Sequence, residues 1–223
     1  MKRIRIIVSI VLIGLSGLQW NEPVKPSPKY VLVLHGGAGT ILKKNMSNAA
    51  EQKYREALTE ALLAGHKLIQ NGGSGLDAVV AAIKVMEDSP LFNAGKGAVF
   101  THDGKNELDA SLMDGATLKA GAVAGVHRVK NPILLARAVM ERSKHVMMVG
   151  DGAEIFAKQE GIELVDPSYF RTEKRWQQLQ RALKEEAAGQ AHADLETAKH
   201  FGTVGAGALG AQGHLSGGTS TGG

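Results

Sequence analysis

The stretch GTVGAGALGAQGHLSGGTSTGG, residues 202–223, consists of two segments of small residues on either side of a turn sequence. The turn-forming cluster at residues 210–213, between two alternating segments, predicts a β-hairpin with a four-residue loop. Gly217 and Gly218 fall within the second predicted strand. Glycine inside a strand lowers its stability, so these two residues would loosen the hairpin.

The register of this hairpin decides which hydroxyl groups become neighbours. Pairing outward from Leu209 opposite His214 places Thr203 level with Ser220. The hydroxyl cluster at residues 219–221 is then expected beside Thr203, because directly opposed residues of an antiparallel pair have adjacent side chains.

Thr203 is the candidate nucleophile. A threonine hydroxyl reacts poorly unless a base lies beside it, and one solution is to cleave the chain before the threonine, so that its freed α-amino group becomes the base. Such an amine has a pKa of about 8, so a useful fraction is unprotonated at neutral pH. Gly202, which precedes the threonine, tolerates conformations that other residues resist. The alternative is that Gly202-Thr203 only begins a strand.

Two motifs in combination extend this interpretation. Gly202-Thr203-Val204-Gly205-Ala206 is followed by Thr219-Ser220-Thr221-Gly222-Gly223, with Thr221 eighteen residues after Thr203. This combination resembles the nucleophile hairpin of the plant-type L-asparaginases and isoaspartyl peptidases, which are N-terminal-nucleophile hydrolases. The resemblance implies that Gly202-Thr203 is an autoproteolytic cleavage site and that Thr203 becomes the catalytic N-terminus of a β-subunit. It also implies that Thr221 is a second catalytic hydroxyl.

The resemblance covers nearly all of residues 31–223 and therefore also implies a fold. That fold is α+β, the four-layer αββα sandwich of the N-terminal-nucleophile (Ntn) hydrolases with antiparallel inner sheets. Residues 30–186 would belong to the α-subunit, residues 187–202 would form a flexible linker ending at the cleavage site, and residues 203–223 would begin the β-subunit. In the complete protein the family suggests a homodimer of αβ units.

An irregular loop is predicted at residues 87–97, EDSPLFNAGKG, because its proline and glycines interrupt regular structure. Exposed carbonyl oxygens suit hard cations, and the loop is similar to the family's Pro-Leu-Phe-Asn-Ala-Gly-x-Gly motif. The resemblance implies that Asn93 reaches the active site and orients the nucleophile, and that backbone oxygens hold a structural sodium ion. The residues that would hold sodium are Met86, Glu87, Ser89, Phe92, Ala94 and Lys96. No organic cofactor is expected.

Hydrophobic periodicity predicts the remaining elements. Ser47 and Ser74 are each expected to cap a helix, the first of which ends at residues 71–73. A continuous apolar run at 30–34 predicts a fully buried strand, and the loop HGGAGT at 35–40 could pack closely against the nucleophile. The other predicted helices cover residues 131–143, 151–160 and 172–186, and the other predicted strands cover residues 97–101, 107–113, 118–126 and 145–149.

The N-terminal segment is basic and then apolar. Three basic residues among the first five precede an apolar run at 6–18, so residues 1–20 predict a signal peptide or an uncleaved N-terminal anchor, and a periplasmic or secreted protein. Residues 21–29 contain three prolines and predict a linker. Without those three leader charges the chain has 23 basic and 22 acidic residues, so no nucleic-acid partner is expected. The absence of cysteine excludes disulfide bonds and a lipoprotein anchor.

Two other catalytic chemistries receive less support from the sequence. No two of the eight histidines have the i,i+4 spacing of a zinc-binding helix, so metal-dependent hydrolysis is not predicted. The three carboxylates at residues 107–114 could serve acid–base catalysis. A half-buried strand with polar residues at its turns is the preferred interpretation.

The resemblance predicts an isoaspartyl peptidase or L-asparaginase precursor, which would hydrolyse β-aspartyl dipeptides and the side-chain amide of asparagine. A glycosylasparaginase and a non-catalytic remnant of the fold are the alternatives. Family members continue beyond the position of Gly223 with a segment that binds the substrate's α-carboxylate and α-amino groups. The chain is therefore expected to be a truncated form, incomplete at the C-terminus and inactive or weakly active.

Overall fold

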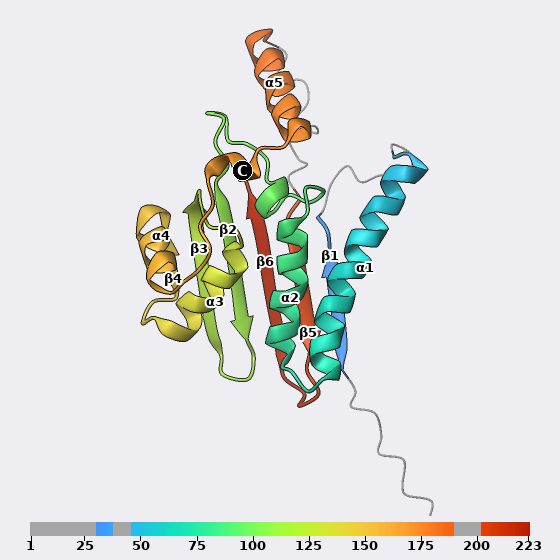
Figure 1. Ribbon diagram of the computed structural model, residues 1–223, viewed down its shortest axis with the longest axis vertical. Helices are drawn as coiled ribbons and strands as arrows, with labels where there is room; N and C mark the ends of the chain where they lie inside the picture. The colour runs from blue at the N-terminus through green and yellow to red at the C-terminus, as the bar shows by residue number, and fades with distance from the viewer. Residues whose placement is uncertain (1–29, 38–45, 190–201) are drawn as a thin grey trace, which may run out of the picture.

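The computed structural model describes residues 30–37, 46–189 and 202–223 (Figure 1). These residues form one six-stranded sheet with helices packed against it. The predicted N-terminal leader and linker, and most of the predicted linker before Gly202, lie outside the described residues. No helix within the described ranges is both long and apolar enough to cross a membrane.

The strands follow the order β1-β5-β6-β2-β3-β4 across the sheet. Neighbouring strands are antiparallel except β3 and β4, which are parallel. The bounds are β1 (Val31–His35), β2 (Leu108–Asp114), β3 (Lys119–Val126), β4 (Met147–Val149), β5 (Val204–Leu209) and β6 (Leu215–Gly222). The hairpin formed by the last two strands therefore lies inside the sheet, between the first strand and the rest (Figure 1).

The helices predicted from the sequence are all present, which confirms an α+β protein. Ser47 caps α1 by accepting a hydrogen bond from the Ala50 amide, and Ser74 forms a capping box with Asp77 at the start of α2. The helical elements are α1 (Asn48–Gln70), α2 (Gly75–Asp88), α3 (Pro132–Arg142), α4 (Gly150–Gln159) and α5 (Glu173–Ala187), with 3₁₀ turns η2 (Gly95–Gly97) and η3 (Pro167–Phe170).

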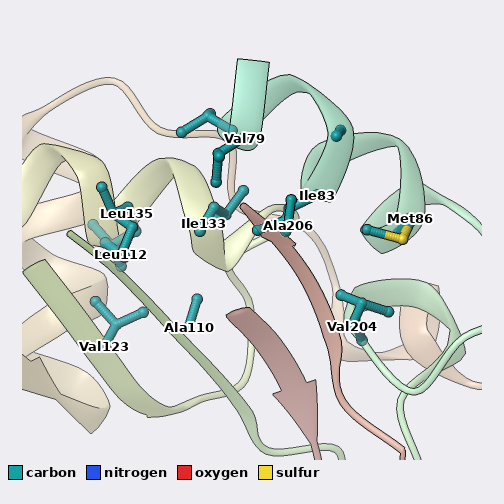
Figure 2. Close-up of a cluster of buried hydrophobic side chains, with 14 of the residues drawn as sticks. Val79, Ile83, Met86, Ala110, Leu112, Val123, Ile133, Leu135, Val204 and Ala206 are labelled. Carbon is teal, nitrogen blue, oxygen red and sulfur yellow. The ribbon is translucent and has the colours of Figure 1, made fainter. Parts of the chain in front are cut away.

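The hydrophobic core lies between the sheet and the helices that cover one of its faces, principally α1, α2 and α3 (Figures 1 and 2). The labelled core residues come from two helices and three strands: Val79, Ile83, Met86, Ala110, Leu112, Val123, Ile133, Leu135, Val204 and Ala206. The described residues thus supply one helical layer and one sheet, which are two of the layers in the expected sandwich.

The other face of the sheet carries apolar side chains that no described residue covers. Val31 and Val33 in β1 are 52% and 58% exposed, so the prediction of a fully buried strand is wrong. Side chains alternate between the faces of a strand, and only Leu32 and Leu34 of β1 pack against the core. A shallow hollow on the uncovered face is bordered by residues of β1, β5, β6, β2 and β3.

The hairpin register differs from the prediction by one residue. Leu209 pairs with Leu215 rather than with His214, and Val204 pairs with Ser220. The Gly210 amide donates to the His214 carbonyl at 2.9 Å, so the loop has three residues instead of four. Gly213 has a φ of +83°, the left-handed conformation with which such three-residue loops commonly end. The next step of this register places Thr203 opposite Thr221.

The predicted strand at residues 97–101 is also wrong. Gly97 belongs to a 3₁₀ turn, and residues 98–101 pair with no strand. Residues 98 and 99 bond instead to two buried side chains: the Val99 amide donates to Asn93 Oδ1, and Asn106 Nδ2 donates to the carbonyls of Ala98 and Val99. The Thr101 amide donates to the Lys105 carbonyl in a turn. A backbone satisfied by asparagine side chains does not need a sheet ladder.

We predict that Gly121→Ala lowers the stability of the 223-residue chain. A Cβ at Gly121 in β3 would collide with the Ala136 carbonyl of α3 and lie 2.7 Å from the Met140 Cβ, so the helix would have to move. Overpacking of this kind costs about 1–3 kcal/mol, measurable by chemical denaturation. The matched control is Gly152→Ala in α4, where a Cβ meets nothing within 4 Å. Equal stability of the two variants would contradict the packing described here.

Candidate active site

The two threonines predicted to be catalytic are hydrogen-bonded to each other. Thr203 Oγ1 donates to Thr221 Oγ1 at 3.0 Å, across the open end of the β5–β6 hairpin. The pairing predicted from sequence was one residue off, but the corrected register brings the two hydroxyls together more directly. Both residues are partly buried. This pair is the centre of the candidate site, because a neighbouring hydroxyl is a group that can orient a nucleophile and relay its proton.

The peptide bond before Thr203 is approached closely by the loop that follows β1. Gly37 has a φ of +122°, and a Cβ at this position would lie 3.1 Å from the Gly202 Cα and 3.7 Å from the Thr203 amide nitrogen. Close packing of this glycine-rich loop against the nucleophile was one prediction from the sequence, and the described part of the loop packs in this way. A larger residue at Gly37 would be strained and would push against Gly202.

His35, which precedes this loop, lies against the hairpin near the same end of β5. It pairs with Gly205, and a Cβ at Gly205 would collide with the His35 ring. Gly205 is therefore needed to let the imidazole lie across β5. No hydrogen bond among the described residues joins His35 to Thr203 or Thr221.

Asn93 holds the end of β6 through its side-chain amide. Its Nδ2 donates to the Gly222 carbonyl at 2.8 Å, and its Oδ1 accepts from the Val99 amide at 2.8 Å. The family resemblance predicted that Asn93 reaches the active site and orients the nucleophile. In the structure the contact is with the residue after Thr221, so any effect on the hydroxyl pair is exerted through the backbone of β6.

The Glu87 side chain is a functional candidate that the sequence analysis missed. It is completely buried, and its Oε1 accepts hydrogen bonds from Ser220 Oγ at 2.7 Å and from the Ile133 amide at 3.0 Å. Oε2 has no hydrogen-bond partner among the described residues. Burial raises the pKa of the Glu87 carboxyl to about 8, against the opposing effect of these hydrogen bonds. The sequence carried a signal, because Glu87 lies four residues after Ile83 on the apolar stripe of α2.

Two glycines of the loop predicted to bind sodium lie close to backbone carbonyls. Gly95 has a φ of +50°, and a Cβ there would collide with the Glu87 carbonyl; a Cβ at Gly97 would collide with the Phe92 carbonyl. The Glu87 and Phe92 carbonyls are two of the oxygens predicted from the sequence to hold sodium. Two further proposed ligands already accept backbone hydrogen bonds: the Met86 carbonyl from Ser89 at 3.3 Å, and the Ala94 carbonyl from Gly97 at 3.1 Å. Each of these carbonyls retains a second lone pair.

In the part of the chain that the structure describes, side chains do not form a metal-binding site. No cluster of three or more histidine, aspartate or glutamate side chains there could hold a metal ion. The carboxylates of β2 bond to nearby backbone and hydroxyl groups: Asp109 accepts from the Gly125 amide, and Asp114 accepts from the Thr117 hydroxyl. These contacts agree with the half-buried strand preferred from the sequence.

Similarity to known proteins identifies the family of this chain. Residues 28–223 match the family model described as "Asparaginase". The chain belongs to the asparaginase family. This assignment confirms the resemblance found in the hairpin and loop motifs.

Individual members of the asparaginase family are similar over much of the chain. It is 51% identical over 197 residues to an isoaspartyl peptidase of Salmonella typhimurium and 52% identical over 197 residues to one of Escherichia coli, with 87% of this chain covered in each case. A plant-type L-asparaginase of Pyrococcus abyssi is 51% identical over 152 residues, which cover 68% of this chain. The matched regions span 63%, 61% and 48% of these relatives, so the chain corresponds to less than two thirds of their length.

We predict that Asn93→Ala lowers the free energy of unfolding by at least about 2 kcal/mol, because the Gly222 carbonyl and the Val99 amide would both lose a buried partner. Denaturant titration of the 223-residue chain measures the loss. Asn48→Ala, at an exposed position in the first turn of α1, is the control and should change stability by less than about 0.5 kcal/mol. A loss at position 93 no larger than that of the control would show that the Asn93 contacts do not support β6.

Proposed function

We propose that this member of the asparaginase family is the precursor of an isoaspartyl peptidase and L-asparaginase with Thr203 as its nucleophile. The observation that carries the proposal is the 3.0 Å hydrogen bond from Thr203 Oγ1 to Thr221 Oγ1, at the position where the sequence predicts the cleavage site. The close approach of Gly37 to Gly202 supports it, because the scissile peptide is confined by packed backbone. Relatives named isoaspartyl peptidase and plant-type L-asparaginase support the substrate class.

Activation would begin with cleavage of the chain's own backbone. Thr203 Oγ1 attacks the Gly202 carbonyl carbon, the bond from that carbon to the Thr203 nitrogen breaks, and the nitrogen takes up the hydroxyl proton. Water then hydrolyses the resulting ester, which leaves a carboxylate on Gly202 and a free α-amino group on Thr203. Thr221 can orient the attacking hydroxyl through the hydrogen bond already present.

The same hydroxyl would then act on substrate. The free amine of Thr203 accepts the Oγ1 proton while the oxygen attacks the β-carbonyl of an asparagine or a β-aspartyl dipeptide. Ammonia or the second amino acid leaves with a proton, and water hydrolyses the aspartyl ester to release aspartate. We propose that the complete enzyme is a homodimer of αβ units.

We predict that the full gene product cleaves itself between Gly202 and Thr203, and that the cleaved protein hydrolyses asparagine and β-aspartyl dipeptides. Intact mass measurement during incubation should show two fragments whose masses sum to the precursor plus one water. Thr203→Ala should remain intact and inactive. Thr221→Ala should be slower by on the order of a hundredfold, the scale of a lost acid–base or orienting group.

Two results would refute the assignment of Thr203. Cleavage at any other bond, or equal cleavage of wild type and Thr203→Ala, would exclude it as the autoproteolytic nucleophile. Cleavage without hydrolysis of either substrate would favour a non-catalytic member of the fold. Activity restricted to glycosylated asparagine would favour a glycosylasparaginase.

We propose that the 86–97 loop holds a structural sodium ion through the backbone oxygens of the six residues predicted from the sequence. Replacing sodium with tetramethylammonium at equal ionic strength should lower the melting temperature of the chain, because the large cation cannot enter a shell of carbonyls. Gly95→Ala should abolish this dependence on sodium, since its Cβ would collide with the Glu87 carbonyl.

The control for the sodium experiment is Gly161→Ala. Gly161 has a φ of +70°, so the substitution introduces similar backbone strain, but a Cβ there meets nothing within 4 Å. Its melting temperature should fall and should still respond to sodium. An identical wild-type melting curve in the two cations would count against the site.

We propose that the protein is exported, on the basis of the basic and apolar leader at residues 1–20. Cell fractionation should place it in the periplasm or the medium, or at the membrane if the leader is not cleaved. N-terminal sequencing should show a start after the apolar run in the exported form. Cytoplasmic protein beginning at Met1 would contradict this prediction.

A further inference from the structure

The segment from the end of α2 to the 3₁₀ turn η2 forms hydrogen bonds with β6 on both sides of Thr221. Glu87 Oε1 accepts from the hydroxyl of Ser220, the residue before Thr221, and Asn93 Nδ2 donates to the carbonyl of Gly222, the residue after it. Ser220 and Gly222 are buried, on the face of the sheet toward the helices. Thr221 lies on the opposite face, since side chains alternate along a strand.

The hairpin itself offers little side-chain packing that could hold Thr221 in place. Gly205 and Gly207 occupy β5, and Gly217, Gly218 and Gly222 occupy β6. Glycine in a strand has no side chain to pack and loses more conformational freedom on folding than other residues. Apart from its backbone pairing with β5 and β2, β6 near the site is therefore held by the few side chains that bond to it.

Glu87 joins this strand to two helices. It belongs to α2, and its Oε1 also accepts from the amide of Ile133, the second residue of α3. Asn131 makes no side-chain capping bond to α3 and donates instead to Asp88, so the Glu87 carboxyl satisfies an amide that the helix leaves without an intrahelical partner. One oxygen atom thus ties α2, α3 and β6 together next to Thr221.

We propose that Glu87 is a positioning residue. Its carboxyl group, through the Ser220 hydroxyl, holds Thr221 in the place where Thr221 Oγ1 accepts the hydrogen bond from Thr203. The consequence for catalysis rests on the function proposed above, whereas the consequence for the geometry of β6 does not. The competing interpretation is that Glu87 only caps α3 and supports the core.

Two serines of β6 provide a matched test. Ser220→Ala removes the bond to Glu87 and leaves the cap on α3 intact. Ser216→Ala is the control: Ser216 is also buried on the helix-facing side of β6, but its hydroxyl reaches Asp114 at 3.4 Å, away from the site. Glu87→Gln retains a carbonyl oxygen that can accept from both Ser220 and Ile133, so it should behave as the wild type.

The first measurement is amide hydrogen exchange at Thr221 and Gly222 in the 223-residue chain, which does not depend on activity. Exchange should be faster by about tenfold or more in Ser220→Ala and unchanged in Ser216→Ala and Glu87→Gln. The second measurement is kcat and KM for a β-aspartyl dipeptide with the full gene product. Ser220→Ala should lower kcat by about tenfold or more with KM changed by less than about threefold, as expected when a catalytic hydroxyl is displaced.

The two measurements separate the two hypotheses. Inactive wild-type protein would refute the proposed function, and hydrogen exchange would still decide whether Glu87 positions Thr221. The positioning role would be overturned if the amides of Thr221 and Gly222 exchanged no faster in Ser220→Ala than in Ser216→Ala. It would also be overturned if they exchanged as fast in Glu87→Gln as in Ser220→Ala. A lowered melting temperature in Ser220→Ala with unchanged exchange at Thr221 and Gly222 would assign Glu87 to the core alone.

Discussion

The insertion of the β5–β6 hairpin between β1 and β2 is the constraint on which the rest of the structure depends. Residues 205–209 of β5 pair with β1, and residues 216–222 of β6 pair with β2. Both partners precede the hairpin by a large part of the chain. Without the hairpin, the described strands would separate into β1 alone and the group β2-β3-β4. The strand that follows Thr203 is therefore a central part of the sheet as well as of the candidate site.

Small residues in this hairpin let other elements come close to it. Gly218 lies beneath α2, where a Cβ would be 3.1 Å from atoms of Val79 and Ile83, and Gly205 lies beneath the His35 ring. Such close approach leaves the hairpin dependent on its neighbours for rigidity. Beside the backbone pairing, the side-chain contacts to β6 next to Thr221 come from a buried glutamate and a buried asparagine of one segment. Fold stability and the position of the candidate nucleophile are consequently linked.

The sequence predicted the features that depend on local chemistry. The Ser47 and Ser74 caps, the helices and the hairpin follow from capping residues, apolar stripes and turn residues that lie close together in the chain. The proximity of Thr203 and Thr221 followed from the same turn. The one-residue error in register arose because the left-handed conformation of Gly213 shortens the loop, and glycine composition alone does not distinguish three-residue from four-residue loops.

Other features could not be read from the sequence because they depend on long-range contacts. Residues 98–101 look like a strand, but the side chains of Asn93 and Asn106 bond to the backbone of Ala98 and Val99 in place of a neighbouring strand. The apolar run of β1 is half exposed because the described residues cover only one face of the sheet. The role of Glu87 became visible only when α3 and β6 were placed against α2.

The most direct test of the central claim is to locate the acyl-enzyme. The full gene product is mixed with a β-aspartyl dipeptide, quenched in acid and digested, and the modified peptide is identified by mass spectrometry. The account predicts one aspartyl group attached to a peptide that begins at Thr203. An aspartyl group on any other residue, or on a peptide in which Thr203 is still joined to Gly202, would contradict it.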